Sequence, residues 1–153
     1  MKIRKFKNTD AKEACNIIRR CDKEIASKDY PKKVIEMWDK KLTEDYILRK
    51  SKERICFVAT IKEKVVGYIS FDGIEIKKLH VNPDYHKQGI GGKLIGKIED
   101  HCKKNKIKKI LVKSSIHAEK FYEKLGFQKI KTKNQTPKKA KFKLIEMEKE
   151  VKR

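Results

Sequence analysis

Apolar residues recur at helical spacing in the first third of the chain. Five of them follow the three- to four-residue period of an amphipathic helix, namely Ala14, Ile17, Ile18, Cys21 and Ile25. Asp10, with Glu13 three residues later, offers an N-terminal cap for that helix. Pro31 can open a second helix, and Thr43-Glu44-Asp45 is typical of the start of a third. Because Lys2 to Phe6 alternates polar and apolar residues, we expect a strand before the helices.

From Ile55 onward the apolar period becomes two, which is typical of strands. We expect strands at 55–61, 65–71 and 74–81, with turns at Lys62-Glu63-Lys64 and Asp72-Gly73 and an end at Asn82-Pro83-Asp84. Four residues then mark one face of a helix, namely Leu94, Ile95, Ile98 and Cys102. The remaining segments predict a strand at 109–113, a helix at 118–125, a strand at 127–131, a polar loop at 132–140 and a strand at 142–147.

This order of elements predicts an α/β fold in which a mixed sheet is flanked by helices. The 153 residues fit a single domain spanning 1–153. A chain of this length buries roughly two-thirds of the surface that its unfolded form exposes, which allows one core with a ligand cleft.

The net charge of +21, from 42 basic and 21 acidic residues, raises the alternative of a nucleic-acid-binding domain. Such a domain should show a basic face with interleaved aromatic residues. Here the lysines are spread along the whole chain and no cluster of aromatic and lysine residues appears. We therefore do not expect nucleic acid to be a partner, and interpret the charge mainly as solvated surface that also attracts an anionic cofactor.

The four cysteines stand singly, at Cys15, Cys21, Cys56 and Cys102. No CxxC pair and no histidine at ligand spacing accompanies them, so neither a metal site nor a disulfide framework is expected. No apolar run approaches the about 20 residues of a membrane span, and the N-terminus lacks the apolar core of a signal peptide. We expect a cytoplasmic protein with no membrane partner.

Between the third strand of the hairpins and the following helix lies a glycine-rich turn, His86-Lys87-Gln88-Gly89-Ile90-Gly91-Gly92. Glycines here let backbone N–H groups converge at the positive end of a helix, where phosphate binds. The dinucleotide motif GxGxxG fails because Leu94 replaces its third glycine, and the P-loop fails at Lys87 and Leu94. The motif alone leaves open a turn that binds no ligand.

The flanking residues narrow this interpretation. Leu79 to Tyr85, followed by HKQGIGGKL, resembles the signature of the GCN5-related N-acetyltransferase superfamily. The resemblance implies that acetyl-CoA is the acyl donor, with backbone contacts to its pantetheine arm and thioester at Leu79 and Val81. It implies a pyrophosphate site at the turn, and the residues expected to contact the cofactor are Leu79, His80, Val81, His86, Lys87, Gln88, Gly89, Ile90, Gly91, Gly92 and Lys93. His86 departs from the Arg or Gln of the family pattern and implies a weaker or pH-dependent contact.

A second segment, Ser115 to Phe127, resembles the downstream motif of the same superfamily, in which FYEKLGF places a tyrosine beside the cofactor sulfur. We expect Ser115 and Tyr122 to contact the cofactor, although many members carry Asn at the position of Ser115. Phe121 and Leu125 are four residues apart and predict the core face of this helix, with Tyr122 about 100° away from it. The reference pKa of a phenol is about 10 and that of a thiol about 8.5, so Tyr122 can protonate the departing thiolate.

The resemblance also implies a fold and a reaction. The fold has a mostly antiparallel sheet of about seven strands, helices on both faces and a V-shaped splay between the fourth and fifth strands. The reaction is direct attack of an amine on the thioester, and the candidate bases are Glu75 and His80, of which a β-bulge decides the one that faces the cleft. We expect His101 and His117 to be solvated.

The acceptor, a small amine or a peptide, should lie near 26–31 and 132–140 by analogy with the family. A homodimer is left open. Two alternatives remain: an acetyl-CoA-binding domain that has lost catalysis, suggested by His86 and Ser115, and the nucleic-acid-binding domain considered above.

Overall fold

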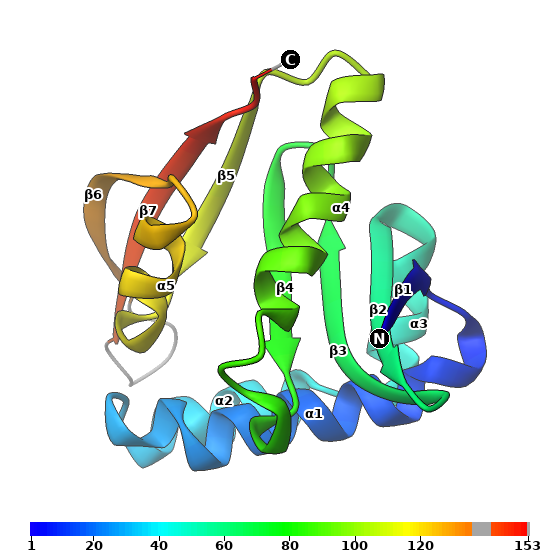
Figure 1. Cartoon of the computed structure of the whole chain (residues 1–153). Helices are drawn as coiled ribbons and strands as arrows, with labels where there is room; N and C mark the ends of the chain where they lie inside the picture. Colours follow the sequence, from blue (N-terminus) through cyan, green and yellow to red (C-terminus); the bar gives the residue numbers. More distant parts are fainter. Residues whose placement is uncertain (136–141, 153) are drawn as a thin grey trace.

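The computed structural model describes residues 1–135 and 142–152, with side chains for 1–130 and 143–152 (Figure 1). Its strands are β1 (Lys2–Lys5), β2 (Ile55–Ile61), β3 (Lys64–Phe71), β4 (Glu75–Val81), β5 (Lys109–Ser114), β6 (Gln128–Gln135) and β7 (Phe142–Glu150). Its α-helices are α1 (Ala11–Glu24), α2 (Lys32–Lys41), α3 (Glu44–Glu53), α4 (Ile90–Lys104) and α5 (Glu119–Lys124). Short 3-10 turns are η1 (Asn8–Asp10), η2 (Ala26–Lys28), η3 (Pro83–Tyr85) and η4 (Ile116–Ala118). The predicted order of elements is confirmed.

Within the described residues, the seven strands form one sheet in the order β1-β2-β3-β4-β5-β7-β6. Neighbouring strands are antiparallel except β4 and β5, which are parallel. Their pairing is confined to Glu75 with Leu111 and Ile76 with Val112, so the two strands separate along the rest of β4. This separation, visible in Figure 1, confirms the expected splay between the fourth and fifth strands.

Helices cover both faces of the sheet, as expected. On one face α4 packs its buried residues Leu94, Ile95 and Ile98 against β3 and β5, and α5 adds to the same apolar cluster. On the other face α1 and α3 pack against β2 and β3 around Ile17 and Tyr68. All four cysteines are buried and free, and none of the described helices is long and apolar enough to cross a lipid bilayer.

The predicted polar loop at 132–140 begins too early. Strand β6 continues to Gln135, where it pairs with Phe142, and the pair Thr132 with Ile145 lies in the same antiparallel ladder. These residues carry almost no apolar side chains, so the hydrophobic period could not mark them as a strand, while the backbone hydrogen bonds of a ladder do not require it. The rest of the predicted loop lies outside the described residues.

Asp10 stabilises the start of α1 through an ion pair with β1. Arg4 donates two hydrogen bonds to the Asp10 carboxylate, at 2.8 and 3.0 Å, and the N–H of Lys7 donates a third at 2.7 Å. Burial raises the pKa of the Asp10 carboxyl, but the hydrogen bonds from Arg4 and Lys7 lower this pKa by more, so it lies below its usual value. The carboxylate is therefore buried but fully paired.

Candidate active site

Strand β4 directs backbone groups that pair with no neighbouring strand toward the splay. The N–H of Asn82 donates to the carbonyl of Val66 at 2.8 Å, and His80 lies opposite Tyr68 in the ladder with β3. In an antiparallel pair, the backbone N–H and C=O groups of successive residues point alternately toward and away from the partner strand. Those of Leu79 and Val81 therefore point away from β3. These are the two residues for which backbone contacts were expected, and they face the opening between β4 and β5.

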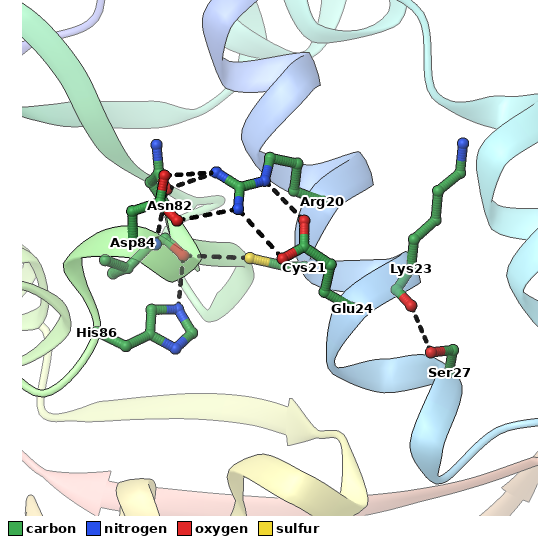
Figure 2. Close-up of polar contacts among 9 residues, drawn as sticks. Arg20, Cys21, Lys23, Glu24, Ser27, Asn82, Asp84 and His86 are labelled. Atoms are coloured by element: carbon green, nitrogen blue, oxygen red, sulfur yellow. Dashed lines mark hydrogen bonds and ion pairs between the residues drawn. The ribbon is translucent and has the colours of Figure 1, made fainter.

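Two side chains meet at the carbonyl oxygen of Val81. The Cys21 Sγ atom on α1 lies 3.2 Å from it, and the His86 Nε2 atom lies 2.7 Å from it (Figure 2). His86, expected beside the phosphates, is thus turned back onto β4 in this structure. The contact also places the C-terminal half of α1 directly against the open edge of the sheet.

The glycine-rich turn leads into α4 with a left-handed backbone at Lys87, where φ is 63°, and at Gly89, where φ is 76°. No side chain caps the N-terminus of α4. The first N–H groups of a helix have no intrahelical partner, so they are available to an anion. The turn therefore has the donors that the sequence predicted for a pyrophosphate.

A cavity of about 1030 Å³ follows the splay and joins these features. It brings together most of the predicted site residues, namely Glu75, Leu79, His80, Val81, His86, Lys87, Gly89, Ile90, Gly91, Ser115 and Tyr122. Three predicted residues do not line it. Gln88 is exposed, and Gly92 with Lys93 instead borders a separate hollow between β1 and α4.

Tyr122 lies on the core face of α5. The prediction for this face was wrong for Phe121, whereas Leu125 does pack against the core as expected. Tyr122 is 6% exposed and its ring packs between those of Phe121 and Phe127, with centroids 5.1 and 5.3 Å apart. Phe121 is 37% exposed, and its ring covers Gly91 of α4. Helix α5 has only six residues, too few for its apolar period to define a face. Burial raises the pKa of the Tyr122 phenol above its usual range, so it stays protonated.

A β-bulge decides the orientation of the two candidate bases. Phe71 pairs with Ile76 but Ser70 pairs with Lys78, so β4 carries one extra residue there. In a regular strand the side chains of Glu75 and His80 would point to opposite faces of the sheet. Because of the extra residue, both side chains point to the face toward α1. Both candidates therefore face the same side of the cavity.

His80 and Glu75 differ in their electrostatic environment. Burial, then Lys78 and His117, lowers the pKa of His80 to about 3, so its imidazole is neutral at pH 7. Its Nδ1 atom is buried and has no hydrogen-bond partner among the described residues. Glu75 forms an ion pair with Lys77 at 3.6 Å.

His117 is exposed, as expected from the sequence, and it also links two loops. Its Nε2 lies 3.2 Å from the Ser115 Oγ, and its Nδ1 lies 3.7 Å from the Asp29 carboxylate. The adjacent Tyr30 hydroxyl accepts from the N–H of Ile116 at 2.9 Å and donates to the carbonyl of Lys143 at 2.8 Å. The connection between α1 and α2 thus fixes the loop that follows β5.

Sequence reasoning missed Asp22, which lines the cavity from α1. It is four residues after the buried Ile18 and therefore lies on the apolar stripe of an amphipathic helix. A carboxylate on the apolar stripe of a helix was the feature of the sequence that could have identified Asp22 as a candidate. Burial raises the pKa of Asp22 to about 6, an effect that Lys78 partly offsets and Asp39 reinforces.

Arg20 connects this turn of α1 to the loop after β4. Its guanidinium lies within 2.7 to 3.1 Å of the Asn82, Asp84 and Glu24 side chains, as Figure 2 shows. The network couples the position of α1 to the residues that precede the glycine-rich turn.

A family model described as acetyltransferase (GNAT) domain matches residues 21–151. The uncharacterized N-acetyltransferase YafP of Escherichia coli strain K12 is 30% identical over 134 residues, which are 86% of this chain and 83% of YafP.

Solved structures of low sequence identity share the fold. A GCN5-related N-acetyltransferase (aminotransferase, class II) of Rhodopseudomonas palustris has a TM-score of 0.91 at 21% identity, covering 98% of this chain and 95% of its own. The PaiA N-acetyltransferase of Thermoplasma acidophilum, solved with coenzyme A, has a TM-score of 0.79 at 21% identity. The match covers 97% of this chain and 98% of the PaiA chain. YncA, a putative acetyltransferase of Salmonella typhimurium solved with acetyl-CoA, has a TM-score of 0.73 at 18% identity, covering 100% and 95%.

The family model covers most of the chain, and its match includes β4, the glycine-rich turn and the helix that carries Tyr122. The open edge of β4 and the uncapped start of α4 are the features that the resemblance of the sequence to this family had predicted. This chain belongs to the GNAT acetyltransferase family.

Proposed function

We propose that this protein is an acetyl-CoA-dependent N-acetyltransferase that transfers an acetyl group to an amine by direct attack. The observation that carries the proposal is the cavity joining the open edge of β4 to the uncapped N-terminus of α4. Family membership supports it, as do the structural relatives from Thermoplasma acidophilum and Salmonella typhimurium that contain coenzyme A and acetyl-CoA.

The residues present fit this cofactor. A pantetheine arm needs a run of backbone donors and acceptors, which Leu79 and Val81 offer at the splay. A pyrophosphate needs convergent N–H groups, which the turn at Gly89 and Gly91 offers. Acetyl-CoA would supply the acetyl group already activated as a thioester.

The protein residues then have distinct tasks. The backbone N–H groups of β4 would stabilise negative charge that develops on the carbonyl oxygen, usually the largest contribution to such chemistry. As the amine nitrogen forms its bond to the carbonyl carbon, the C–S bond breaks and its electron pair stays on sulfur. Tyr122 would give that sulfur a proton, and the nitrogen's surplus proton would return to the phenolate, leaving a neutral amide.

The amine must first lose a proton, since alkyl ammonium groups have pKa values near that of lysine, about 10.4. Of the two bases proposed from sequence, His80 is the weaker because its pKa is about 3. Glu75, which forms an ion pair with Lys77 and faces the same side of the cavity, is the other candidate.

Calorimetric titration with acetyl-CoA and with duplex DNA, each at two salt concentrations, tests the proposal against its alternatives. We expect micromolar binding of acetyl-CoA and weak, salt-sensitive binding of DNA. Tight binding of DNA without binding of acetyl-CoA would contradict the proposal. Binding of acetyl-CoA without release of its thiol in the presence of any amine would instead indicate a domain that has lost catalysis.

A further inference from the structure

On the basis of the function proposed above, we further propose that Asp22 binds the ammonium group of the acceptor and takes its proton. We also infer that the acceptor is a primary amine on an apolar body. Asp22 would then be a catalytic residue in the helix that faces β4.

The backbone places Asp22 beside the edge at which the thioester is expected. Three residues on one side of α1 line the cavity, namely Ile18, Cys21 and Asp22, together with Ile25 just after the helix. Cys21, next in the chain, lies 3.2 Å from the carbonyl of Val81, so this turn of α1 is in contact with β4. Asp22 and Lys78, which lies beside the bulge in β4, line the same cavity, and the positive charge of Lys78 lowers the pKa of the Asp22 carboxyl.

Asp22 is set apart from the other acidic residues around it by having no partner. Asp39 pairs with Arg19 at 2.9 Å, Glu24 pairs with Arg20 at 2.7 Å, and Glu75 pairs with Lys77 at 3.6 Å. Within the described part of the chain, Asp22 forms neither a hydrogen bond nor an ion pair. In a protein with twice as many basic as acidic residues, an unpaired carboxylate in a cavity is an unusual arrangement. A bound cationic ligand would give the Asp22 carboxylate the ion-pair partner that the protein does not supply.

The walls beside Asp22 are mainly apolar. Four apolar or aromatic residues line the same cavity, from the end of α1 to the start of α3, namely Ile25, Trp38, Leu42 and Tyr46. Six lysines line the cavity as a whole. Lys77 pairs with Glu75, and Lys41 is exposed. Three others lie away from α1 and α2, on the glycine-rich turn, β5 and α5, namely Lys87, Lys113 and Lys124. Lys78 is the cation that acts on Asp22. The site therefore favours an apolar body that carries one positive charge over an acceptor that carries many polar groups.

In this proposal the acceptor loses a proton to Asp22 before its nitrogen attacks the thioester. The Asp22 carboxylate takes one proton from the ammonium, which becomes an amine with a free electron pair, and the carboxyl later releases that proton to solvent. The amine then forms the C–N bond as the C–S bond breaks, Tyr122 protonates the departing sulfur, and the nitrogen returns its surplus proton to the phenolate. A carboxyl whose pKa is raised toward neutrality is ionised at pH 7 and yet is a stronger base than an ordinary carboxylate.

The test uses the full chain and two variants of equal charge change. Asp22→Asn removes the carboxylate from the cavity. Glu36→Gln, the control, removes a carboxylate from the exposed surface of α2, where it forms only a 3.8 Å contact with Lys32. The probes are phenethylamine and the uncharged 2-phenylethanol, with binding followed by ligand-observed NMR and transfer followed by thiol release.

We expect Asp22→Asn to lower kcat/KM for phenethylamine roughly 10- to 100-fold and to weaken its binding, with Glu36→Gln close to wild type. Binding of 2-phenylethanol and calorimetric binding of acetyl-CoA should be unchanged in Asp22→Asn, which also shows that the variant is folded. Asp22→Glu should recover part of the activity.

The inference is overturned if Asp22→Asn acetylates phenethylamine within about twofold of Glu36→Gln. It is also overturned if the wild type acetylates amines that carry an anionic group but not phenethylamine. Failure of the wild type to bind acetyl-CoA would contradict the proposed function instead. Binding of phenethylamine that is lost in Asp22→Asn would even then support the ammonium site.

Discussion

Gly91 of α4 and Phe121 of α5 are in such close contact that a Cβ atom at position 91 would lie 2.8 Å from the Cζ atom of the ring. Gly91→Ala must therefore displace the partly exposed ring or the helix, at a cost of about 1 to 3 kcal/mol, which the better helix propensity of alanine offsets by about 1 kcal/mol. Because Phe121 also packs on Tyr122, the change should disturb the site as well as the fold. We expect a lower melting temperature and weaker calorimetric binding of acetyl-CoA.

Gly96→Ala is the matched control on the same helix. A Cβ atom there meets nothing within 4 Å, and alanine is the better helix former. This variant should gain about 0.5 to 1 kcal/mol and bind acetyl-CoA like the wild type. Equal behaviour of the two variants would contradict the packing described for α4 and α5.

The parts of the site that depend on short stretches of chain could be predicted from sequence. The glycine-rich turn and the strand before it form one continuous segment, so their local chemistry already indicates a phosphate site. Tyr122 was found by resemblance, but its position in the core was not. With only six residues in α5, contacts with Phe127 and with α4 decide which face is buried.

The parts that depend on contacts between distant segments could not be predicted. The bulge in β4 arises from its register with β3, which places Glu75 and His80 on one face although their separation in sequence predicts opposite faces. Tyr30 meets Ile116, 86 residues away, through a single hydrogen bond. Asp22 had a local signal, its place on an apolar stripe, but only the fold shows that a cavity lies beside it.

Tyr122→Phe tests the proposed proton donor. The phenol has no hydrogen-bond partner among the described residues, and its ring packing is retained by phenylalanine, so stability and binding of acetyl-CoA should change little. The kcat for amine acetylation should fall about 100-fold. Since burial raises the pKa of the phenol, wild-type activity should not decline through its ionisation up to pH 9. Unchanged kcat in the variant would remove Tyr122 from the mechanism.

Asp10→Asn should destabilise the protein at pH 7. The variant breaks the ion pair with Arg4 and leaves the guanidinium with a poorer partner, at a cost of about 1.5 to 3 kcal/mol. The pKa of Asp10 is lowered in the folded state, so its contribution is present above the unfolded value of about 3.9 and is lost as pH falls below it. Urea denaturation at pH 7 and pH 3 should show a difference between variant and wild type that shrinks at pH 3.

Asp22→Asn should have the opposite effect and stabilise the protein at pH 7. The pKa of this carboxyl is raised to about 6 in the fold, so the folded state binds a proton more tightly than the unfolded chain. The contribution of this group to wild-type stability thus falls as pH rises from about 4 through 6. Asparagine does not ionise, so the free energy of unfolding of the variant at pH 7 should be higher by about 1 to 2 kcal/mol. A stability gain combined with lost activity is typical of a functional residue, whereas loss of both would indicate a structural one.

The pH dependence of kcat/KM should report the same carboxyl. Below pH 6 Asp22 becomes protonated, and it can then neither bind an ammonium nor take its proton, so kcat/KM for phenethylamine should fall about tenfold per pH unit and level off above pH 7.

The charged groups that act on Asp22 are Lys78 on β4 and Asp39 on α2, and two further titratable side chains, His80 on β4 and Lys41 on α2, line the same cavity. His80 is already neutral above pH 4, so it cannot produce this limb of the profile. Asp22→Glu should keep an acidic limb, and Asp22→Asn should lose it together with most of the activity. An acidic limb at pH 6 that persists in Asp22→Asn would assign the titration to another group, with Glu75 as the next residue to replace.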